Sequence, residues 1–128
     1  ADRGMRLDEA TTLVKRALAE EPYNGAYLDS LGWAYFKQNR LTEAEGELRK
    51  AVERNAHDPT IRDHLGDVYF KAGRVDLAAA EWERALVEWR QTVPAENEAD
   101  KVAELEKKLS NLKHRFAQEK SPGDAKPR

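Results

Sequence analysis

Residues 28–35 read LDSLGWAY, and residues 62–69 read RDHLGDVY. The two stretches share the pair Leu-Gly and the Tyr that follows it, and they begin 34 residues apart. Apolar residues recur at the same offset downstream, first as Ala44, Leu48 and Ala51 and then as Ala78, Trp82 and Ala85. A self-match at one fixed period predicts a repeat architecture, in which each unit buries its apolar face against its neighbours.

The same offset continues toward the N-terminus, where Ala10, Val14 and Ala17 precede their counterparts by 34 residues. We therefore expect a repeat array over 6–92, composed of a half repeat at 6–24 and full repeats at 25–58 and 59–92. The first unit lacks its front half, and the chain does not begin with Met. We expect a fragment or processed product that ends a longer array.

Apolar residues spaced three and four apart predict helices over 7–20, 26–38, 42–54, 59–71 and 76–90. Asp58-Pro59 is an expected helix start, because Asp accepts hydrogen bonds from free backbone amides and Pro suits the first helical position. Asp8 is expected to cap the first helix in the same way. Thr42 and Glu45 have the spacing of a capping box, which predicts that Thr42 begins the third helix.

Gly32 and Gly66 occupy the same site in the two full repeats, inside predicted helices. A glycine in a helix interior costs about 0.8–1 kcal/mol relative to alanine. Its presence at both sites predicts that two helix backbones approach each other there too closely for a Cβ atom.

The 34-residue pattern ends at about Pro94. The apolar residues beyond it alternate spacings of three and four, which predicts one long helix, and they are Val102, Leu105, Leu109, Leu112 and Phe116. We expect residues 93–119 to cap the array and to cover a face that holds Trp82 and Trp89 in the core. Residues 1–5 are expected to fray, and the polar tail 120–128 is expected to be disordered.

These motifs resemble the tetratricopeptide repeat family, whose pattern places Trp, Leu-Gly, Tyr, Ala, Phe, Ala and Pro at fixed sites over 34 residues. The chain departs from that pattern at the Trp site, which holds Leu28 and Arg62, at one Phe site, which holds Leu48, and at one Pro site, which holds Ala56. The resemblance implies an all-α fold of antiparallel helix pairs stacked into a right-handed superhelix with a C-terminal capping helix.

The resemblance also implies a concave surface, lined by the first helix of each pair, that binds peptides. Mapped onto this chain, the partner-binding residues are Asp29, Trp33, Phe36, Lys37, Thr60, Asp63, Asp67, Phe70 and Lys71. One subset of the family grips a C-terminal carboxylate with Lys and Asn at sites where this chain has Asp and Trp, so carboxylate capture is not expected. The aspartates beside Trp33 favour a basic or amphipathic partner segment, and the alternative is an ordinary solvated helix face.

The net charge of −2 is unevenly distributed. Residues 101–128 carry eight basic and four acidic groups, whereas residues 1–100 carry 14 basic and 20 acidic groups. Binding to a nucleic acid backbone needs clustered positive charge, which the acidic repeat region does not supply. Nucleic acid is therefore not an expected partner.

Catalytic chemistry has little support in the sequence. The three histidines stand in separate predicted elements, without the spacing of three or four residues that a helical metal site needs. The chain has no Cys, no Gly-rich phosphate loop and no nucleophile elbow. We expect no catalytic residues, no metal and no cofactor, and we predict that the protein is not an enzyme.

No apolar run approaches the roughly 18–20 residues needed to span a bilayer, and no signal-peptide pattern opens the chain. Direct membrane insertion by this fragment is not expected. The absence of cysteine is compatible with either the cytoplasm or the periplasm of a bacterium.

The two ends of the array suggest a second function. The first helix lacks its repeat partner and would leave apolar residues uncovered, while the last helix is longer than its support and would overhang it. The residues expected at a self-association surface are Leu13, Val14, Leu18, Leu109, Leu112 and Phe116. The sequence thus predicts a non-catalytic protein-interaction scaffold, and the alternative is a module that forms homodimers or larger homo-oligomers through its end helices.

Overall fold

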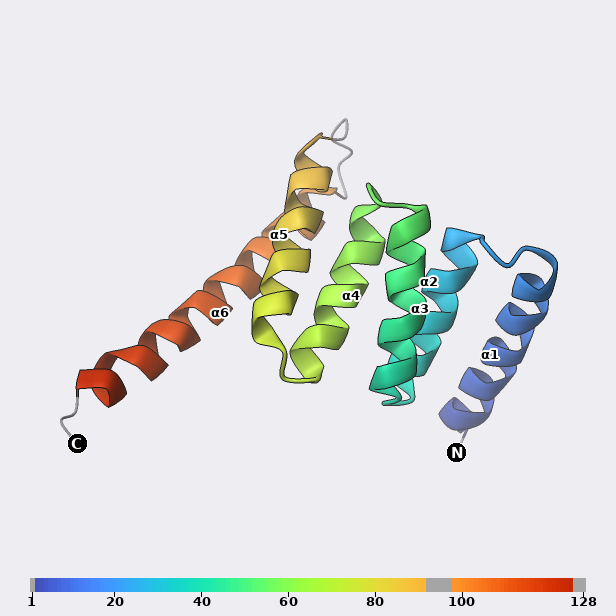
Figure 1. Cartoon of the computed structure of the whole chain (residues 1–128), viewed down its shortest axis with the longest axis horizontal. Coiled ribbons are helices and arrows are strands. Elements are labelled where there is room, and N and C mark those ends of the chain that lie inside the picture. The colour runs from blue at the N-terminus through green and yellow to red at the C-terminus, as the bar shows by residue number, and fades with distance from the viewer. Residues whose placement is uncertain (1, 92–97, 126–128) are drawn as a thin grey trace.

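The computed structural model describes the backbone of residues 2–91 and 98–125 and the side chains of residues 6–91 and 99–116. In these ranges the chain is entirely α-helical (Figure 1), as the repeat pattern predicts. The helices are α1 (Asp2–Glu20), α2 (Gly25–Lys37), α3 (Leu41–Arg54), α4 (Pro59–Lys71), α5 (Val75–Gln91) and α6 (Glu98–Ala125).

Two helices begin with side-chain caps. The Oδ1 atom of Asn24 accepts a hydrogen bond from the Tyr27 amide at 3.0 Å, which caps α2. The Oδ1 atom of Asp58 accepts from the amides of Thr60 and Ile61 at 2.9 and 3.2 Å, and Pro59 is the first residue of α4. The Asp58-Pro59 start predicted from the sequence is confirmed.

The predicted capping box at the start of α3 is wrong. The helix begins at Leu41, so Thr42 and Glu45 lie inside it, and the cap position is held by Arg40 without a side-chain cap. The Arg40 guanidinium instead binds the Glu43 carboxylate at 2.7 and 3.0 Å. The preceding turn determines this start, because its backbone geometry brings the chain into the helix one residue earlier.

That turn recurs in the next repeat with the same hydrogen bonds. The Arg40 amide donates to the Tyr35 carbonyl and the Arg74 amide to the Tyr69 carbonyl, both at 2.9 Å. Each turn contains one residue in the left-handed region, Asn39 at φ 62° and Gly73 at φ 84°. This arrangement is a Schellman motif, and Asn is one of the few non-glycine residues that adopt its left-handed conformation readily. The 34-residue period therefore extends to the turns.

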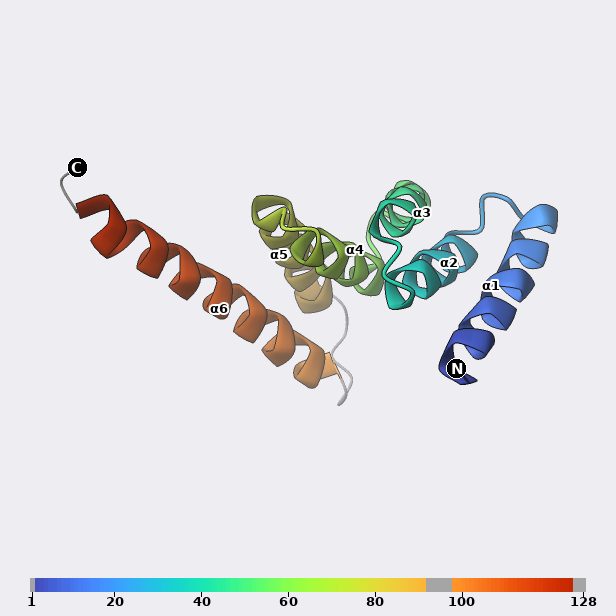
Figure 2. The same ribbon diagram turned by 90° about the horizontal axis from the view of Figure 1, so that it is seen from below.

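The helices pack as successive neighbours. α2 packs against α3 and α4 against α5, while α3 meets α4, α1 meets α2, and α6 meets α5. α2 and α4 also touch each other, and Figure 2 shows them on one side of the array with α3 on the other. At 28 residues, α6 is longer than the 17-residue α5 that supports it, and its C-terminal end projects beyond α5 in both views.

Both ends differ from the sequence-based expectation. α1 is already helical at Asp2, so Asp8 lies within it and the predicted fraying of 1–5 is not seen in residues 2–5. α6 continues to Ala125, through most of the tail predicted to be disordered, while residues 126–128 lie outside the described range, as do Pro94 and the predicted start of the capping helix. A polar composition limits burial, but each residue other than proline that extends an existing helix can still gain a backbone hydrogen bond.

The core is a continuous stripe along the stacked helices. Trp82 is buried and Trp89 packs against the core, as predicted. Arg62, which replaces the usual aromatic residue of its site, bonds to the Glu81 carboxylate at 3.0 Å and to the Ala56 carbonyl at 2.9 Å. A partly buried guanidinium satisfied in this way can replace an apolar ring, because its charge is paired and its donors are used.

Gly32 and Gly66 do mark close approaches, and side chains make the tightest of them. A Cβ atom at Gly32 would lie 2.6 Å from Cγ of Leu48 and 3.3 Å from the backbone carbonyl oxygen of Ala44, whereas one at Gly66 would overlap the indole of Trp82. The predicted approach of two backbones is therefore found at Gly32, whereas at Gly66 the nearest atoms all belong to a side chain. Each glycine accepts the large side chain that its partner helix carries at the equivalent position.

The glycines give a matched stability test. Gly46 lies in α3 with open space around its missing Cβ, so Gly46→Ala should raise the free energy of unfolding by about 0.8–1 kcal/mol. Gly66→Ala should lower it by about 1–3 kcal/mol, because the Trp82 ring must move out of a packed site. Urea denaturation of the two variants measures both changes. Equal stabilisation by the two substitutions would contradict the packing role of Gly66.

Candidate functional site

The predicted partner-binding residues fall into two clusters, and the first lies between α2 and α4. The Asp29 carboxylate and Nδ1 of His64 are 2.8 Å apart. The indole of Trp33 stacks on the His64 ring with 4.0 Å between centroids, and on the Phe36 ring with 4.7 Å. Asp29, Trp33 and Phe36 come from α2 and His64 from α4, so this aromatic cluster joins neighbouring repeats.

Two lysines cover the rings of this cluster. The Lys37 ammonium lies 5.3 Å from the centroid of Trp33, and the Lys71 ammonium lies 5.4 Å from the centroid of Phe36. A cation over the face of an aromatic ring is attracted by the electrons of the ring. Lys37 and Lys71 are the last residues of α2 and α4, so one repeat position supplies both cations.

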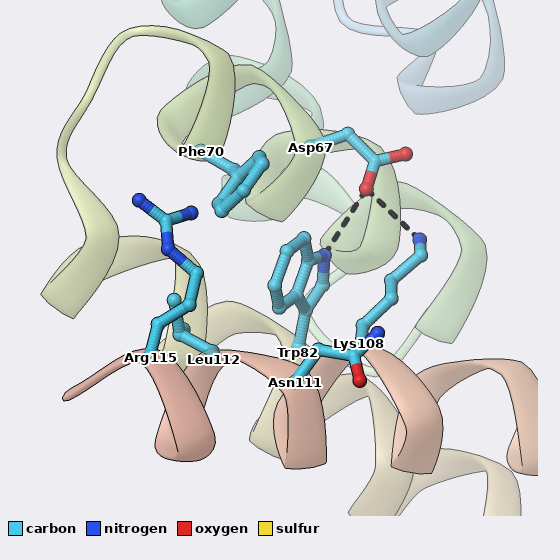
Figure 3. Close-up of a pocket in the computed structure, with 7 residues that line it drawn as sticks. All are labelled: Asp67, Phe70, Trp82, Lys108, Asn111, Leu112 and Arg115. Carbon is cyan, nitrogen blue, oxygen red and sulfur yellow. Dashed lines mark hydrogen bonds and ion pairs between the residues drawn. The ribbon is translucent and has the colours of Figure 1, made fainter. Parts of the chain in front are cut away.

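The second cluster joins α4, α5 and α6 (Figure 3). The Lys108 ammonium of α6 binds the carboxylates of Asp63 and Asp67 at 2.8 and 2.9 Å. Asp67 also accepts a hydrogen bond from Nε1 of Trp82 at 3.2 Å. Asp67 thus connects three helices, and both aspartates of α4 face a cation of the same chain.

Charge and burial act together in this cluster. Burial raises the pKa of Asp67 above its ordinary value, although the hydrogen bond from Lys108 acts in the opposite direction. Burial alone would lower the pKa of Lys108, but its hydrogen bonds to Asp63 and Asp67 outweigh this and raise it. The two carboxylates hold the one ammonium strongly in its charged form. Its single positive charge, however, is shared between two negative charges, so neither carboxylate is fully compensated for the loss of water.

A cavity of about 250 Å³ lies beside this cluster. Figure 3 shows the Phe70 ring, the Trp82 ring and the α6 side chains around it. The ring centroids of Phe70 and Trp82 are 5.6 Å apart, and the Arg115 guanidinium lies 5.6 Å from the Phe70 centroid. Leu112 and Asn111 of α6 line it from below in this view. The lining is therefore largely aromatic and aliphatic, with polar groups toward its rim.

Thr60, the remaining predicted groove residue, lies apart from both clusters. It is exposed in the first turn of α4, and its amide is used by the Asp58 cap. Eight of the nine predicted residues therefore meet in two neighbouring clusters.

Four residues of these clusters were not assigned to the site from the sequence: His64, Trp82, Lys108 and Arg115. His64 occupies the repeat site of Ser30, so the first repeat gives no hint of its role. Lys108 and Arg115 are seven residues apart and share a face of α6 with Leu112, which is the signal that could have indicated them.

The predicted self-association residues are mostly covered within the chain. Leu109 and Leu112 are buried, and Val14, Leu18 and Phe116 are partly buried against the core, so Leu109 and Leu112 do not overhang as expected. They pack inward because α6 turns its apolar stripe onto α5. Leu13 differs from the others, since 63% of it is exposed on α1.

Among the residues that the structure describes, no group of three or more His, Asp or Glu side chains could hold a metal ion. In the same part of the chain, no helix combines the length and apolar character needed to cross a membrane.

The sequence and fold were compared with known proteins. The model of a family described as "Tetratricopeptide repeat" matches the sequence twice, over residues 3–59 and 30–97. No match was found among curated proteins.

Several solved structures share the fold. The structure of PcrH in complex with the chaperone-binding region of PopD has a TM-score of 0.79 at 14% identity, covering 89% of this chain and 84% of that one. A thermophilic protein of Thermus thermophilus, TTC0263, has a TM-score of 0.68 at 25% identity, covering 88% of this chain and 53% of that one. The first repeat domain of Spaghetti (RPAP3), bound to an HSP90 peptide, has a TM-score of 0.66 at 19% identity, covering 84% and 83%.

Lys108 offers a test of the second cluster. In a Lys108→Met variant two partly buried carboxylates lose their cation, and the free energy of unfolding at pH 7 should fall by about 1–2 kcal/mol. The folded-state pKa of Asp67, already raised, should rise further. A carboxyl with a raised folded-state pKa destabilises the fold when it is charged, so the deficit should shrink as the pH falls through that raised pKa, which lies above the ordinary value of an Asp carboxyl.

The matched control is Lys107→Met, which removes an exposed cation one residue away. This change should alter stability by less than about 0.5 kcal/mol. Urea denaturation at pH 7 and at acid pH measures both variants. A Lys108→Met deficit that does not depend on pH would contradict the electrostatic origin of the effect.

Proposed function

The chain belongs to the tetratricopeptide repeat family, and from this premise we propose that it is a non-catalytic scaffold that binds a segment of a partner protein. The binding face comprises the first cluster between α2 and α4 and the second cluster around Lys108. Its residues include the predicted Asp29, Trp33, Phe36, Lys37, Asp63, Asp67, Phe70 and Lys71, and Thr60 would stand at its edge.

The half-exposed aromatic cluster of Trp33, Phe36 and His64 is the observation that carries this proposal. Large rings that are held rigidly and remain accessible lose little conformational freedom on binding, which makes them typical anchors of interfaces. Trp33 is stacked on two rings and covered by a lysine, so its orientation is fixed before a partner arrives.

The solved structures give independent support of a general kind. PcrH is in complex with a region of PopD, and the Spaghetti domain is bound to an HSP90 peptide. Proteins with this fold thus hold segments of other proteins, and the same use of the fold is proposed for this chain.

Trp33 is the residue to test. Peptides that bind the wild type are first selected from a displayed library of random 12-residue sequences, and their affinities are measured by fluorescence anisotropy. Trp33→Ala should weaken binding by about 30-fold or more, which is the size expected for a central aromatic anchor. Trp33→Phe, which keeps a ring in the stack, should lose much less.

The matched control is Tyr23→Ala. Tyr23 is 69% exposed in the connection between α1 and α2, and it contacts Arg54 rather than either cluster. Circular dichroism and the melting temperature show whether each variant is folded. Selected peptides that bind Trp33→Ala and Tyr23→Ala equally well would rule out this face as the binding site.

Self-association is the second candidate, and the exposure of Leu13 favours it. Burying one leucine side chain contributes about 1.5–3 kcal/mol, so a second copy covering α1 would gain from contact there. Light scattering at high micromolar concentration provides the test. A dimer that Leu13→Glu converts to a monomer would support this candidate, and a strictly monomeric wild type would eliminate it for this chain.

A further inference from the structure

The charges of the binding face differ from what the sequence suggests. From the sequence, Asp29, Asp63 and Asp67 favour a basic or amphipathic partner. In the structure each of these carboxylates already has a partner within the chain. Asp29 bonds to His64, and Asp63 and Asp67 share Lys108.

These aspartates are also poorly accessible. The side chains of Asp29, Asp63 and Asp67 are 17, 14 and 25% exposed. A basic partner would have to compete with Lys108 for two of them, and that ammonium makes two short charge-assisted hydrogen bonds. One ammonium offsets only one of the two charges of Asp63 and Asp67, but burial and these internal hydrogen bonds leave the three carboxylates less available to a partner than exposed aspartates would be.

The accessible charges are cationic. Lys37, Lys71 and Arg115 are exposed, and each lies over an aromatic ring of the face. Among the residues with described side chains, none of the three has a carboxylate partner. They come from α2, α4 and α6 respectively, so three of the four helices of the face each supply one of these cations.

The cavity beside the second cluster supplies an apolar element. Phe70 is 39% exposed at its wall, and the buried Trp82 indole, whose N–H is bonded to Asp67, forms another part of the wall. Cavities of about 150 Å³ lined by apolar side chains are known to hold a benzene molecule, so 250 Å³ accommodates one leucine, methionine or phenylalanine side chain. The Arg115 guanidinium lies next to this cavity, where it can meet a neighbouring carboxylate.

We propose that the partner segment is acidic and apolar: one large apolar side chain enters the cavity lined by Phe70, Trp82 and Leu112, and flanking carboxylates pair with Lys37, Lys71 and Arg115. This inference rests on the proposed function and adds the chemistry of the partner. Pairing at solvent-exposed cations adds modest affinity per contact but selects strongly between acidic and basic segments. The internal pairs of Asp29, Asp63 and Asp67 stay intact in the complex.

The random 12-residue library tests the partner chemistry directly. Peptides selected on the wild type should be enriched in Asp and Glu, should carry at least one Leu, Met or Phe, and should bind more weakly as salt is added. Enrichment of Lys and Arg would overturn the inference, and so would selected peptides without charge bias or a library without any binder.

A charge-reversal triple locates the acidic contacts. Lys37→Glu, Lys71→Glu and Arg115→Glu together should weaken binding of the selected peptides by about 10- to 100-fold. The control triple, Arg16→Glu, Lys107→Glu and Lys113→Glu, changes the net charge equally at exposed cations outside both clusters and should change affinity by less than about threefold. Equal losses of peptide affinity in the two triple variants would mean that only the net charge of the protein matters. That result would overturn the assignment of the acidic contacts to Lys37, Lys71 and Arg115.

The cavity is tested by filling it. Asn111 is exposed at the side of the cavity, so Asn111→Phe should place a ring there at little cost to folding. The selected peptides should bind Asn111→Phe about 10-fold or more weakly than they bind the wild type. Replacing the Leu, Met or Phe of the peptide by Ser should weaken binding to the wild type by a similar factor. The same peptide change should cause little further loss of affinity for Asn111→Phe. Additive losses would place the apolar side chain elsewhere and overturn this part of the inference.

Two outcomes separate this inference from the proposed function. Peptides that lose affinity for Trp33→Ala but keep it for the charge-reversal triple would leave the scaffold function standing and reject the acidic partner. If no selected peptide depends on Trp33, both the proposed function and this inference fail.

Binding of a 12-nucleotide oligouridylate is measured in parallel. If it binds more tightly than any selected peptide, and if the charge-reversal triple abolishes that binding, the three cations would be assigned to phosphate recognition and the inference would be overturned.

Discussion

The indole of Trp82 fills the space that Gly66 leaves by having no side chain, and much of the C-terminal half depends on this contact. It brings α5 close to α4, as Leu48 does for α3 and α2 at Gly32. Because Trp is larger than Leu, its ring reaches further and its N–H arrives at Asp67. One packing contact thus positions a carboxylate, the lysine bound to it and one wall of the cavity.

The parts of the structure that follow from periodicity could be predicted from the sequence. Helix pairs, the buried stripe and the Asp58 cap depend on neighbouring residues or on a spacing that repeats, and both can be read along the chain. The start of α3 could not, because the competing Schellman turn around Asn39 depends on backbone conformation that the Thr42–Glu45 spacing does not reveal. Eight of the nine expected groove residues meet in the structure for the same reason as the core does: they occupy repeat positions.

The partners of those residues could not be predicted in this way. α6 lies outside the 34-residue pattern, so nothing in the sequence aligns Lys108 with Asp63 and Asp67, or Arg115 with Phe70. When these pairs are not known, Asp29, Asp63 and Asp67 predict an acidic surface. Pairing inside the chain offsets part of this negative charge and limits access to it, while the cations Lys37, Lys71 and Arg115 remain exposed. The charge expected from the sequence differs from the accessible charge in the structure because of tertiary contacts between residues about 40 positions apart. The composition of the chain does not reveal such contacts.

Trp33 and Trp82 belong to the same face but to different clusters, and one is half-exposed while the other is buried beside the cavity. The emission of an indole moves to shorter wavelength when its surroundings become drier, and it is quenched when a protonated imidazole or a carboxylic acid stands close. Trp33 is stacked on His64, and Trp82 is bonded to Asp67. Two of the three tryptophans of the chain therefore act as optical reporters, whose intrinsic fluorescence registers hydration at the two clusters without an added label, while Trp89 adds a third signal.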